Sequence, residues 1–275
     1  MDEYARAVLL GVVQAVTEFL PISSSGHLIL VPEFLGESSS PLTFDVGLHV
    51  GTLVAVLGYF WRDWVRMATS AVDDVTHRGV AVRRWSPDGR LGLLLALGTI
   101  PAVIAGFTLQ SWIEDNVRQP LVIASMLIGV GGLLWLADRY GELVLKISDM
   151  TPARSLVIGC AQAAALIPGV SRSGATIATS RALGFDRPAA ARFSFLLSAP
   201  IVAGAAILKF AEAMSGDEVV RWGPLIVGAV TSGIVGALVI RVFLSFIARA
   251  TLTVFVWYRI ALGLAVIAAV ATGVL

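Results

Sequence analysis

Six apolar stretches of this sequence are long enough to cross the hydrocarbon core of a bilayer, which takes roughly 17–25 helical residues. Charged residues make up only 14% of the chain. A soluble domain has about 25%, so there are too few here to cover a water-exposed surface. Outer-membrane barrels show alternating ten-residue segments instead. We therefore expect an all-α polytopic membrane protein with full spans at Leu42–Phe60, Leu91–Phe107, Pro120–Ala137, Phe193–Ala213, Pro224–Ala248 and Val254–Leu275.

The other bulk features exclude further classes. The net charge of +1 creates no field that would attract a polyanion, so no nucleic-acid partner is expected. The single cysteine, Cys160, cannot form an internal disulfide, and we interpret it as a small apolar residue. Asp2 and Glu3 stand where a signal peptide carries Lys or Arg, so we expect no cleavable leader.

Two apolar regions, Ala5–Leu35 and Ser155–Leu183, are interrupted by polar, Gly- and Pro-rich segments. The interruptions are Pro21–His27 and Pro168–Gly174, and neither arm of either region is long enough to span comfortably. Non-helical backbone at membrane depth is tolerated only where protein or a water-filled cavity satisfies it. Both regions are therefore predicted to be re-entrant helix–loop–helix hairpins.

The two interrupted regions resemble each other when the first is shifted by 148 residues. Six of the 16 positions 11–26 are then identical, three of them inside the interruption, where Ser23, Ser25 and Gly26 fall on Ser171, Ser173 and Gly174. We predict one integral-membrane domain, 1–275, built as an internal repeat with halves of approximately 1–137 and 150–275.

The positions of the basic residues predict the orientation. One choice of topology puts fourteen Lys and Arg residues on one side, including those of 62–90, and four on the other. The richer side is expected to be cytoplasmic. Three full spans in each half invert the second half relative to the first, so the two interruptions meet near the bilayer midplane. A cysteine at Ser38 should then label from outside, and one at Ser86 should not.

Glu18, Asp45, Arg172 and Arg259 lie inside apolar segments, where an unpaired charge is costly, and are functional candidates. Gln14 and Glu18 share a helix face, and two oxygen ligands one turn apart suit Mg²⁺ or Ca²⁺. The alternative is a polar pair that bonds a neighbouring helix. Ser23, Ser24, Ser25 and His27 supply hydroxyls and an imidazole beside Glu18, although a serine run before glycine is also a common loop and cap signal.

The second interruption has the composition of an anion cradle. Ser171, Ser173 and Thr176 supply hydroxyls, Gly174 lets backbone N–H groups approach a ligand, and Arg172 offers a planar fork that matches phosphate. The alternative is a helix cap with an arginine that reaches the membrane surface. Arg172 facing Glu18, His27 and serine hydroxyls favours phosphoryl transfer on a lipid-linked substrate.

The two motifs, residues 14–27 (QAVTEFLPISSSGH) and 168–176 (PGVSRSGAT), resemble those of the undecaprenyl-diphosphate phosphatase family, also called the bacitracin-resistance protein family. The segments 44–49 and 193–197 are similar too, so the resemblance covers essentially the whole chain. It implies removal of the terminal phosphate from a C55 polyprenyl diphosphate, which recycles the carrier lipid for envelope glycan synthesis. It also implies a cell-membrane location, a cavity open to the outer face and dependence on a divalent cation.

By the same resemblance, Glu18 is the essential acid, Ser24 and His27 belong to the catalytic group, and Arg172 binds the diphosphate. The first acidic position of the motif is often Glu and is Gln14 here, which cannot act as an acid or base. Either Ser24 or His27 could attack phosphorus. We favour Ser24, with His27 as acid and base, because a hydroxyl activated by a neighbouring base is the commoner arrangement. His49 and Arg259 are candidates for supporting groups or for structural pairs with Asp45 or the lipid headgroup.

Two other functions fit part of this pattern. A transporter or flippase for polyprenyl phosphate lipids would use an inverted repeat and the Arg172 cradle but would need no nucleophile. A small channel is disfavoured because an anion-clamping site would trap its ion. Assembly into a homodimer is a further possibility that the sequence leaves open.

Overall fold

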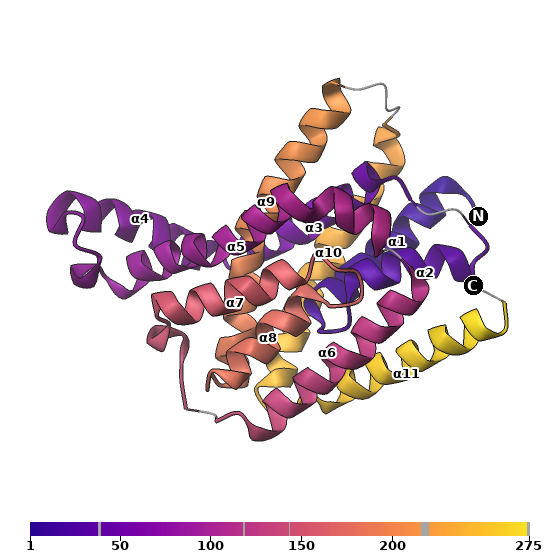
Figure 1. Cartoon of the computed structure of the whole chain (residues 1–275). Coiled ribbons are helices and arrows are strands. Elements are labelled where there is room, and N and C mark those ends of the chain that lie inside the picture. The colour runs from indigo at the N-terminus through magenta and orange to yellow at the C-terminus, as the bar shows by residue number, and fades with distance from the viewer. Residues whose placement is uncertain (38–39, 118, 143, 216–219, 274–275) are drawn as a thin grey trace.

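The computed structural model describes residues 1–37, 40–117, 119–142, 144–215 and 220–273. Ser38, Arg118 and the last two residues of the sixth predicted span lie outside this set. The described regular structure is helical, apart from one isolated β-bridge between Leu145 and Phe185. The α-helices are α1 Glu3–Phe19, α2 Ser24–Phe34, α3 Leu42–Tyr59, α4 Trp61–Arg78, α5 Pro87–Asn116, α6 Pro120–Tyr140, α7 Pro152–Ala164, α8 Arg172–Ala182, α9 Arg187–Ser215, α10 Trp222–Ile247 and α11 Thr253–Ala271. Two short 3₁₀ helices lie at Val82–Arg84 and Ile147–Asp149 (Figure 1).

The all-helical, multi-pass character of the chain is confirmed. In the part of the chain that the structure describes, five helices are long and apolar enough to cross a membrane: α6, α10, α11, and the segments Pro87–Leu109 of α5 and Arg187–Ala211 of α9. A sixth is present if α3 and α4, which meet at a bend of 72°, count as one span. Each predicted full span therefore corresponds to a helix.

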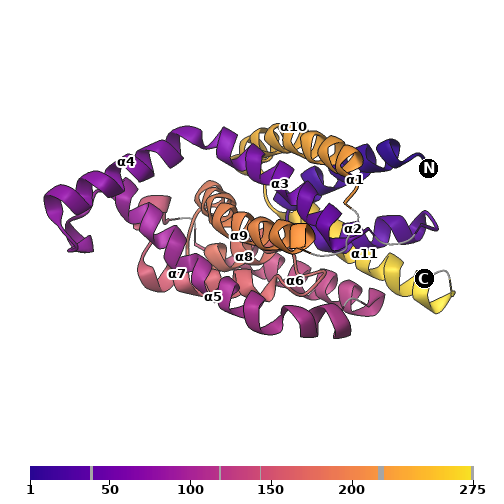
Figure 2. The ribbon, with the colours of Figure 1, turned by 90° about the horizontal axis from the view of Figure 1, so that it is seen from above.

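Helix α4 occupies most of the basic segment 62–90, which lies between the first two predicted spans and in which we predicted no helix. Its residues Met67 and Asp74 are buried, and Asp74 Oδ2 accepts hydrogen bonds from the backbone N and Oγ of Ser86, at 2.9 and 2.7 Å. Counting apolar residues misses this helix because most of its surface is polar. It projects from the rest of the molecule beside the start of α5 (Figures 1 and 2).

Both interrupted regions fold as two short helices joined by a turn, α1 with α2 and α7 with α8. The longer arm of each packs on a long helix through glycine. A Cβ on Gly11 of α1 would lie 2.7 Å from the carbonyl oxygen of Gly228 on α10. A Cβ on Gly159 of α7 would lie 2.2 Å from that of Gly98 on α5. No side chain fits between backbones this close.

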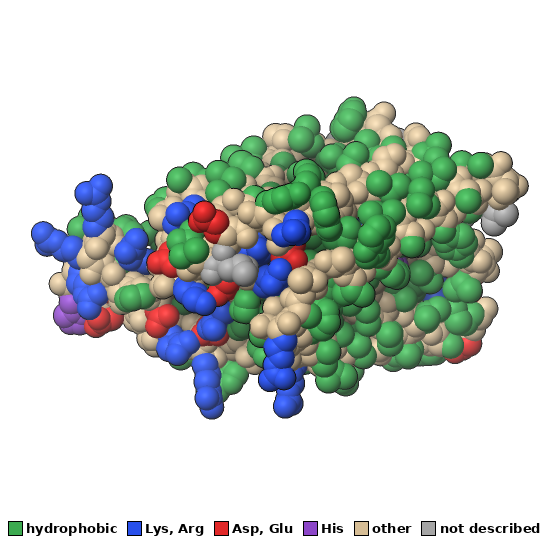
Figure 3. All heavy atoms as spheres, turned by 90° about the horizontal axis from the view of Figure 1, so that it is seen from below, with side chains coloured by type: hydrophobic (Ala, Val, Ile, Leu, Met, Phe, Trp, Pro, Cys, Tyr) green, Lys and Arg blue, Asp and Glu red, His purple; other side chains and the backbone are tan. Residues whose placement is uncertain are grey.

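The core lies where these helices meet. Phe19, next to Glu18 on α1, packs edge-to-face on Phe195 of α9 with ring centroids 5.2 Å apart, and Phe195 contacts Phe243 of α10. Outside this core, many large apolar side chains are exposed over the body of the molecule (Figure 3). Lys, Arg, Asp and Glu gather at the end that carries α4 (Figure 3). Such a surface is suited to lipid contact over most of its area.

One charged cluster is buried where we expected ordinary surface arginines. Arg181 of α8 is fully buried, and its Nε lies 3.2 Å from Oδ1 of Asp138 on α6. Asp138 also pairs with Arg187 at 2.7 Å and accepts from the backbone N of Leu252, just before α11, at 3.0 Å. Arg181 is one of the fourteen basic residues counted on the cytoplasmic side, and the sequence did not indicate its burial. The cluster joins the ends of α6, α8, α9 and α11. Its negative and positive side chains compensate one another's charge in the buried environment.

Candidate active site

Two serines in the turns have left-handed backbone conformations. Ser23 has φ 77° and Ser171 has φ 70°, and in the described chain they are the only non-glycine residues with positive φ. Each is an N-cap whose hydroxyl accepts a bond from the backbone N of the glycine three residues on, Gly26 at 3.4 Å and Gly174 at 3.0 Å. Strain of this kind persists only where the surroundings enforce it. It occurs here at two positions that the 148-residue shift superposes.

The two turns lie against each other. Ser173 Oγ, in the second turn, donates to the carbonyl oxygen of Leu20 in the first, at 3.0 Å. Arg259 of α11, fully buried, donates to Pro21 O in the first turn at 3.1 Å and to Gly169 O and Val170 O in the second at 3.0 and 3.2 Å. It also donates to two carbonyl oxygens of α6. Arg259 therefore satisfies backbone acceptors that the broken helices leave open, and it pairs with neither Asp45 nor any other described carboxylate.

Glu18 is the centre of the site. Its Oε1 lies 2.5 Å from Nη2 of Arg172, which joins the two turns by an ion pair. Its Oε2 accepts from Ser24 Oγ at 2.6 Å and from Gln14 Nε2 at 3.1 Å. Nε2 of His49, on α3, lies 3.6 Å from the same oxygen. The structure thus brings together Gln14, Glu18, Ser24 and Arg172, which are up to 158 residues apart in the sequence.

Arg172 and Thr176 are held by α9 through a residue that we had not singled out. Nη1 of Arg172 donates to the backbone oxygen of Ser194 at 3.0 Å, and the hydroxyls of Thr176 and Ser194 lie 2.6 Å apart. Ser194 is fully buried. The available signal in the sequence was a polar serine inside the apolar segment 193–197. These contacts hold the start of α8 against α9.

His27 lies apart from this cluster. Its Nδ1 is 2.7 Å from the carbonyl oxygen of Ser23, and its Nε2 is 2.8 Å from the hydroxyl of Tyr258 on α11. Neither nitrogen bonds Ser24, whose hydroxyl is engaged by Glu18. Tyr258 was absent from the sequence-based site. Only its place beside the buried Arg259 pointed to it.

The similarity of the whole chain to known proteins agrees with this geometry. Residues 7–265 match the family described as bacitracin resistance protein BacA. The chain belongs to this family. Among its relatives, a protein of Desulforudis audaxviator named undecaprenyl-diphosphatase is 46% identical over 95% of this chain and 96% of its own length. Another with the same name, from Geobacter sulfurreducens, is 48% identical over 96% of this chain and 97% of its own.

The donor set for a cation in this BacA-family site is small. Gln14 Oε1 is buried without a hydrogen-bond partner in the structure, and Glu18 Oε2 lies on the same helix face. Two oxygens of this type fit a hard divalent cation as part of its shell. No group of three or more His, Cys, Asp or Glu side chains suited to a metal occurs in the described part of the chain. The protein oxygens therefore fit an ion that also takes ligands from water or from a phosphate.

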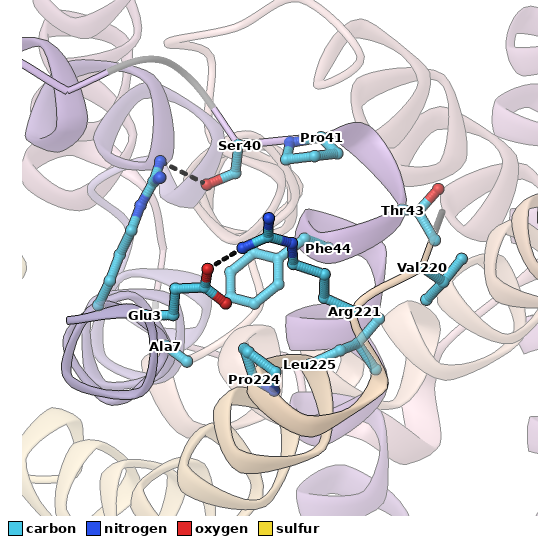
Figure 4. A pocket seen from close by; sticks show the side chains of 11 residues that line it. Glu3, Ala7, Ser40, Pro41, Thr43, Phe44, Val220, Arg221, Pro224 and Leu225 are labelled. Atoms are coloured by element: carbon cyan, nitrogen blue, oxygen red, sulfur yellow. Dashed lines mark hydrogen bonds and ion pairs between the residues drawn. The ribbon is translucent and has the colours of Figure 1, made fainter. Parts of the chain in front are cut away.

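The site is partly open, because Ser24, Ser25 and the guanidinium of Arg172 (14% exposed) reach its surface. A separate cavity of about 260 Å³ lies between the start of α1, residues 40–44 and the start of α10. An ion pair between Glu3 and Arg221 crosses it (Figure 4). None of the predicted site residues lines this cavity.

Proposed function

We propose that this chain removes the terminal phosphate from undecaprenyl diphosphate and leaves the monophosphate lipid. The observation that carries the proposal is the cluster of Glu18, Ser24 and Arg172 at the facing starts of α2 and α8. A hydroxyl bonded to a carboxylate is a candidate nucleophile, and a guanidinium with helix N-termini is an anion site. Relatives that are 46% and 48% identical over nearly their whole length carry the name of this activity.

We further propose that the membrane architecture is an inverted repeat with two re-entrant hairpins and six full spans. The equivalent turns at Ser23 and Ser171 support it, as does the matching glycine packing of α1 on α10 and of α7 on α5. The basic residues gathered at the α4 end support a cytoplasmic location for that end. The site then opens to the outer face of the cell membrane.

In this scheme the diphosphate binds between the starts of α2 and α8. Arg172, which bonds Glu18 without substrate, turns its fork to the phosphate oxygens, and backbone N–H groups at the start of α8 complete the cradle. The hydroxyls of Ser171, Ser173 and Thr176 are bonded within the protein and hold the shape of this cradle. Gly174 must stay without a side chain, because a Cβ there would lie 3.0 Å from Ser171 Cβ and 3.2 Å from Arg259 Nη1. Fixed donors of this kind stabilise the charge that develops during phosphoryl transfer.

Ser24 Oγ attacks the terminal phosphorus as its proton passes to Glu18 Oε2, 2.6 Å away. The anhydride P–O bond breaks and the lipid monophosphate leaves with the electron pair. Water then hydrolyses the phosphoserine: its oxygen bonds to phosphorus and the P–Oγ bond breaks, with the electron pair going to Ser24 Oγ. One water proton remains on the inorganic phosphate, and the other passes through solvent to the lipid monophosphate. Ser24 Oγ recovers its proton from Glu18. Glu18 is therefore the base for Ser24 in this proposal, a role that we first gave to His27.

We propose that a divalent cation, Mg²⁺ or Ca²⁺, binds together with the diphosphate. Gln14 Oε1 and Glu18 would supply its protein ligands, and the phosphate oxygens would supply others. The ion would neutralise charge on the diphosphate. Because Gln14 is neutral, the site should hold the ion weakly when no phosphate is bound.

The biological role follows from the family. Removing a phosphate from the diphosphate form of the carrier lipid returns it to envelope glycan synthesis in the cell membrane. The family description names bacitracin resistance, and we extend that property to this chain.

The test is phosphate release by the purified protein in detergent, with undecaprenyl diphosphate and Mg²⁺ or Ca²⁺. We expect release from the intact chain and a loss of at least about 10³-fold in Glu18→Ala and Arg172→Ala. Ser24→Ala and His27→Ala complete the series, and Arg241→Ala, exposed on α10, is the control. Intact protein that binds the lipid without releasing phosphate would favour a transporter instead.

A further inference from the structure

The protonation of the His27 ring follows from its two contacts. A backbone carbonyl can only accept a hydrogen bond, so Nδ1, 2.7 Å from Ser23 O, must carry the proton. In the neutral ring Nε2 is then the acceptor, and the Tyr258 hydroxyl, 2.8 Å away, is the donor. The lone pair that could take a proton in a reaction is therefore directed at Tyr258.

Tyr258 reaches this place through a rigid frame. It comes from α11, 231 residues along the chain, and its ring stacks on His27 with centroids 5.8 Å apart and an interplanar angle of 11°. The next residue, Arg259, ties α11 to both turns through carbonyl bonds. His27 is buried, 7% exposed, whereas Tyr258 is 44% exposed. The Tyr258 hydroxyl is the polar contact that the buried Nε2 of His27 makes.

We propose that Tyr258 is a positioning residue for His27: its hydroxyl holds the ring with the Nε2 lone pair directed and protected, and it acts on the reaction only through that ring. This inference rests on the proposed phosphatase function. Ser24 and His27 are three residues apart on α2, so they lie on neighbouring positions of one helix face. Because the ring shares the first turn of α2 with Ser24, a ring that is fixed at both nitrogens also fixes the turn that carries the Ser24 hydroxyl. A ring fixed only at Nδ1 leaves Nε2 buried without a partner.

Tyr258→Phe tests this role because it removes only the oxygen and keeps the stacked ring. With undecaprenyl diphosphate in detergent we expect kcat to fall about tenfold or more, within the range that misplacing a reacting group costs, and KM to stay within about twofold. Tyr140→Phe, at the exposed end of α6, is the matched control and should behave as the intact protein. The melting temperatures of both variants should show that they fold.

A second measurement does not depend on activity. In protein with ¹⁵N-labelled histidine, the His27 signals are assigned by their loss in His27→Gln. We expect a protonated Nδ1 and an unprotonated Nε2, and we expect Tyr258→Phe to move the Nε2 resonance while Nδ1 stays in place. If the Phe variant does not fold, a cross-signal between the Tyr258 hydroxyl hydrogen and Nε2 in the intact protein decides the same contact.

The outcomes separate the two proposals. If the intact protein releases no phosphate, the proposed function is contradicted. The nitrogen resonances still test the Tyr258–His27 contact in that case. A protonated Nε2, an Nε2 resonance indifferent to Tyr258→Phe, or kinetics of that variant equal to those of Tyr140→Phe would overturn the positioning role. A change confined to KM would overturn it too, because it would assign Tyr258 to substrate binding.

Discussion

Individual arginine side chains form the hydrogen bonds that the non-helical backbone of this protein needs. Arg259 has no exposed surface and no carboxylate partner among the described residues, and its bonds go to five carbonyl oxygens. Those oxygens belong to α6 and to the two turns that interrupt the helices. In a bilayer no water replaces such bonds, so the guanidinium allows two non-helical segments to lie side by side. Arg172, by contrast, has an ion-pair partner that a substrate anion can replace.

Arg259→Lys should therefore destabilise the fold although it keeps the charge. An ammonium group cannot reach all five acceptors that the planar guanidinium satisfies. We expect the free energy of unfolding to fall by about 2 kcal/mol or more. In detergent, this should lower the melting temperature by about 5 °C or more. Arg241→Lys on the exposed face of α10 is the control. Equal melting temperatures for the two variants would contradict the bridging role.

At the scale of elements, the interrupted helices are held by close backbone contact. Gly159 of α7 meets Gly98 of α5, and Gly11 of α1 meets Gly228 of α10, each without room for a methyl group. Backbones this close gain dispersion contacts that larger side chains would prevent. The glycines thereby set the depth of each interrupted helix, and so the place where its turn meets the other.

Gly159→Ala should separate α7 from α5. The added methyl would lie 2.2 Å from a backbone oxygen that cannot move without its helix. We expect the free energy of unfolding to fall by about 1–3 kcal/mol, which the melting temperature in detergent would show. Gly132→Ala on α6, where a Cβ meets nothing within 4 Å, should be neutral or stabilising by up to about 1 kcal/mol. Equal melting temperatures for the two variants would show that the close contact of α7 with α5 does not depend on Gly159.

For the whole molecule, the charge distribution predicts one orientation. The end with α4 carries the gathered Lys and Arg residues, whereas α2 ends on the opposite side in the proposed topology. Because the proposed topology keeps the basic loops of both halves in the cytoplasm, it inverts the second half of the chain relative to the first.

Cysteine labelling of intact cells checks this orientation. In a Cys160→Ala background, Glu33→Cys should react with a membrane-impermeant maleimide, and Arg83→Cys should react only after the cells are opened. Both residues are exposed, so access alone does not distinguish them. The reverse pattern would turn the proposed site toward the cytoplasm.

Several features of the fold and the site were predictable because they depend on neighbouring residues. Apolar length gave the helices that can span, and the polar interruptions gave the two turns. The spacing of four residues predicted that Gln14 and Glu18 share one helix face, and Gln14 Nε2 lies 3.1 Å from Glu18 Oε2. Helix α4 and the buried Arg181 were missed because hydropathy cannot report how a polar helix or a charge is satisfied by a distant part of the chain.

The sequence by itself determined a membrane protein with two polar interruptions and the residue types of a phosphate site. Only the tertiary structure decided which groups act on one another: Glu18 pairs with Arg172, His27 bonds Tyr258, and Arg259 bonds the carbonyl oxygen of Pro21. The physical reason is the separation of the interacting residues along the sequence. Periodicity fixes the face of a helix on which a residue lies, whereas partners 150 to 240 residues apart are set by how the helices pack.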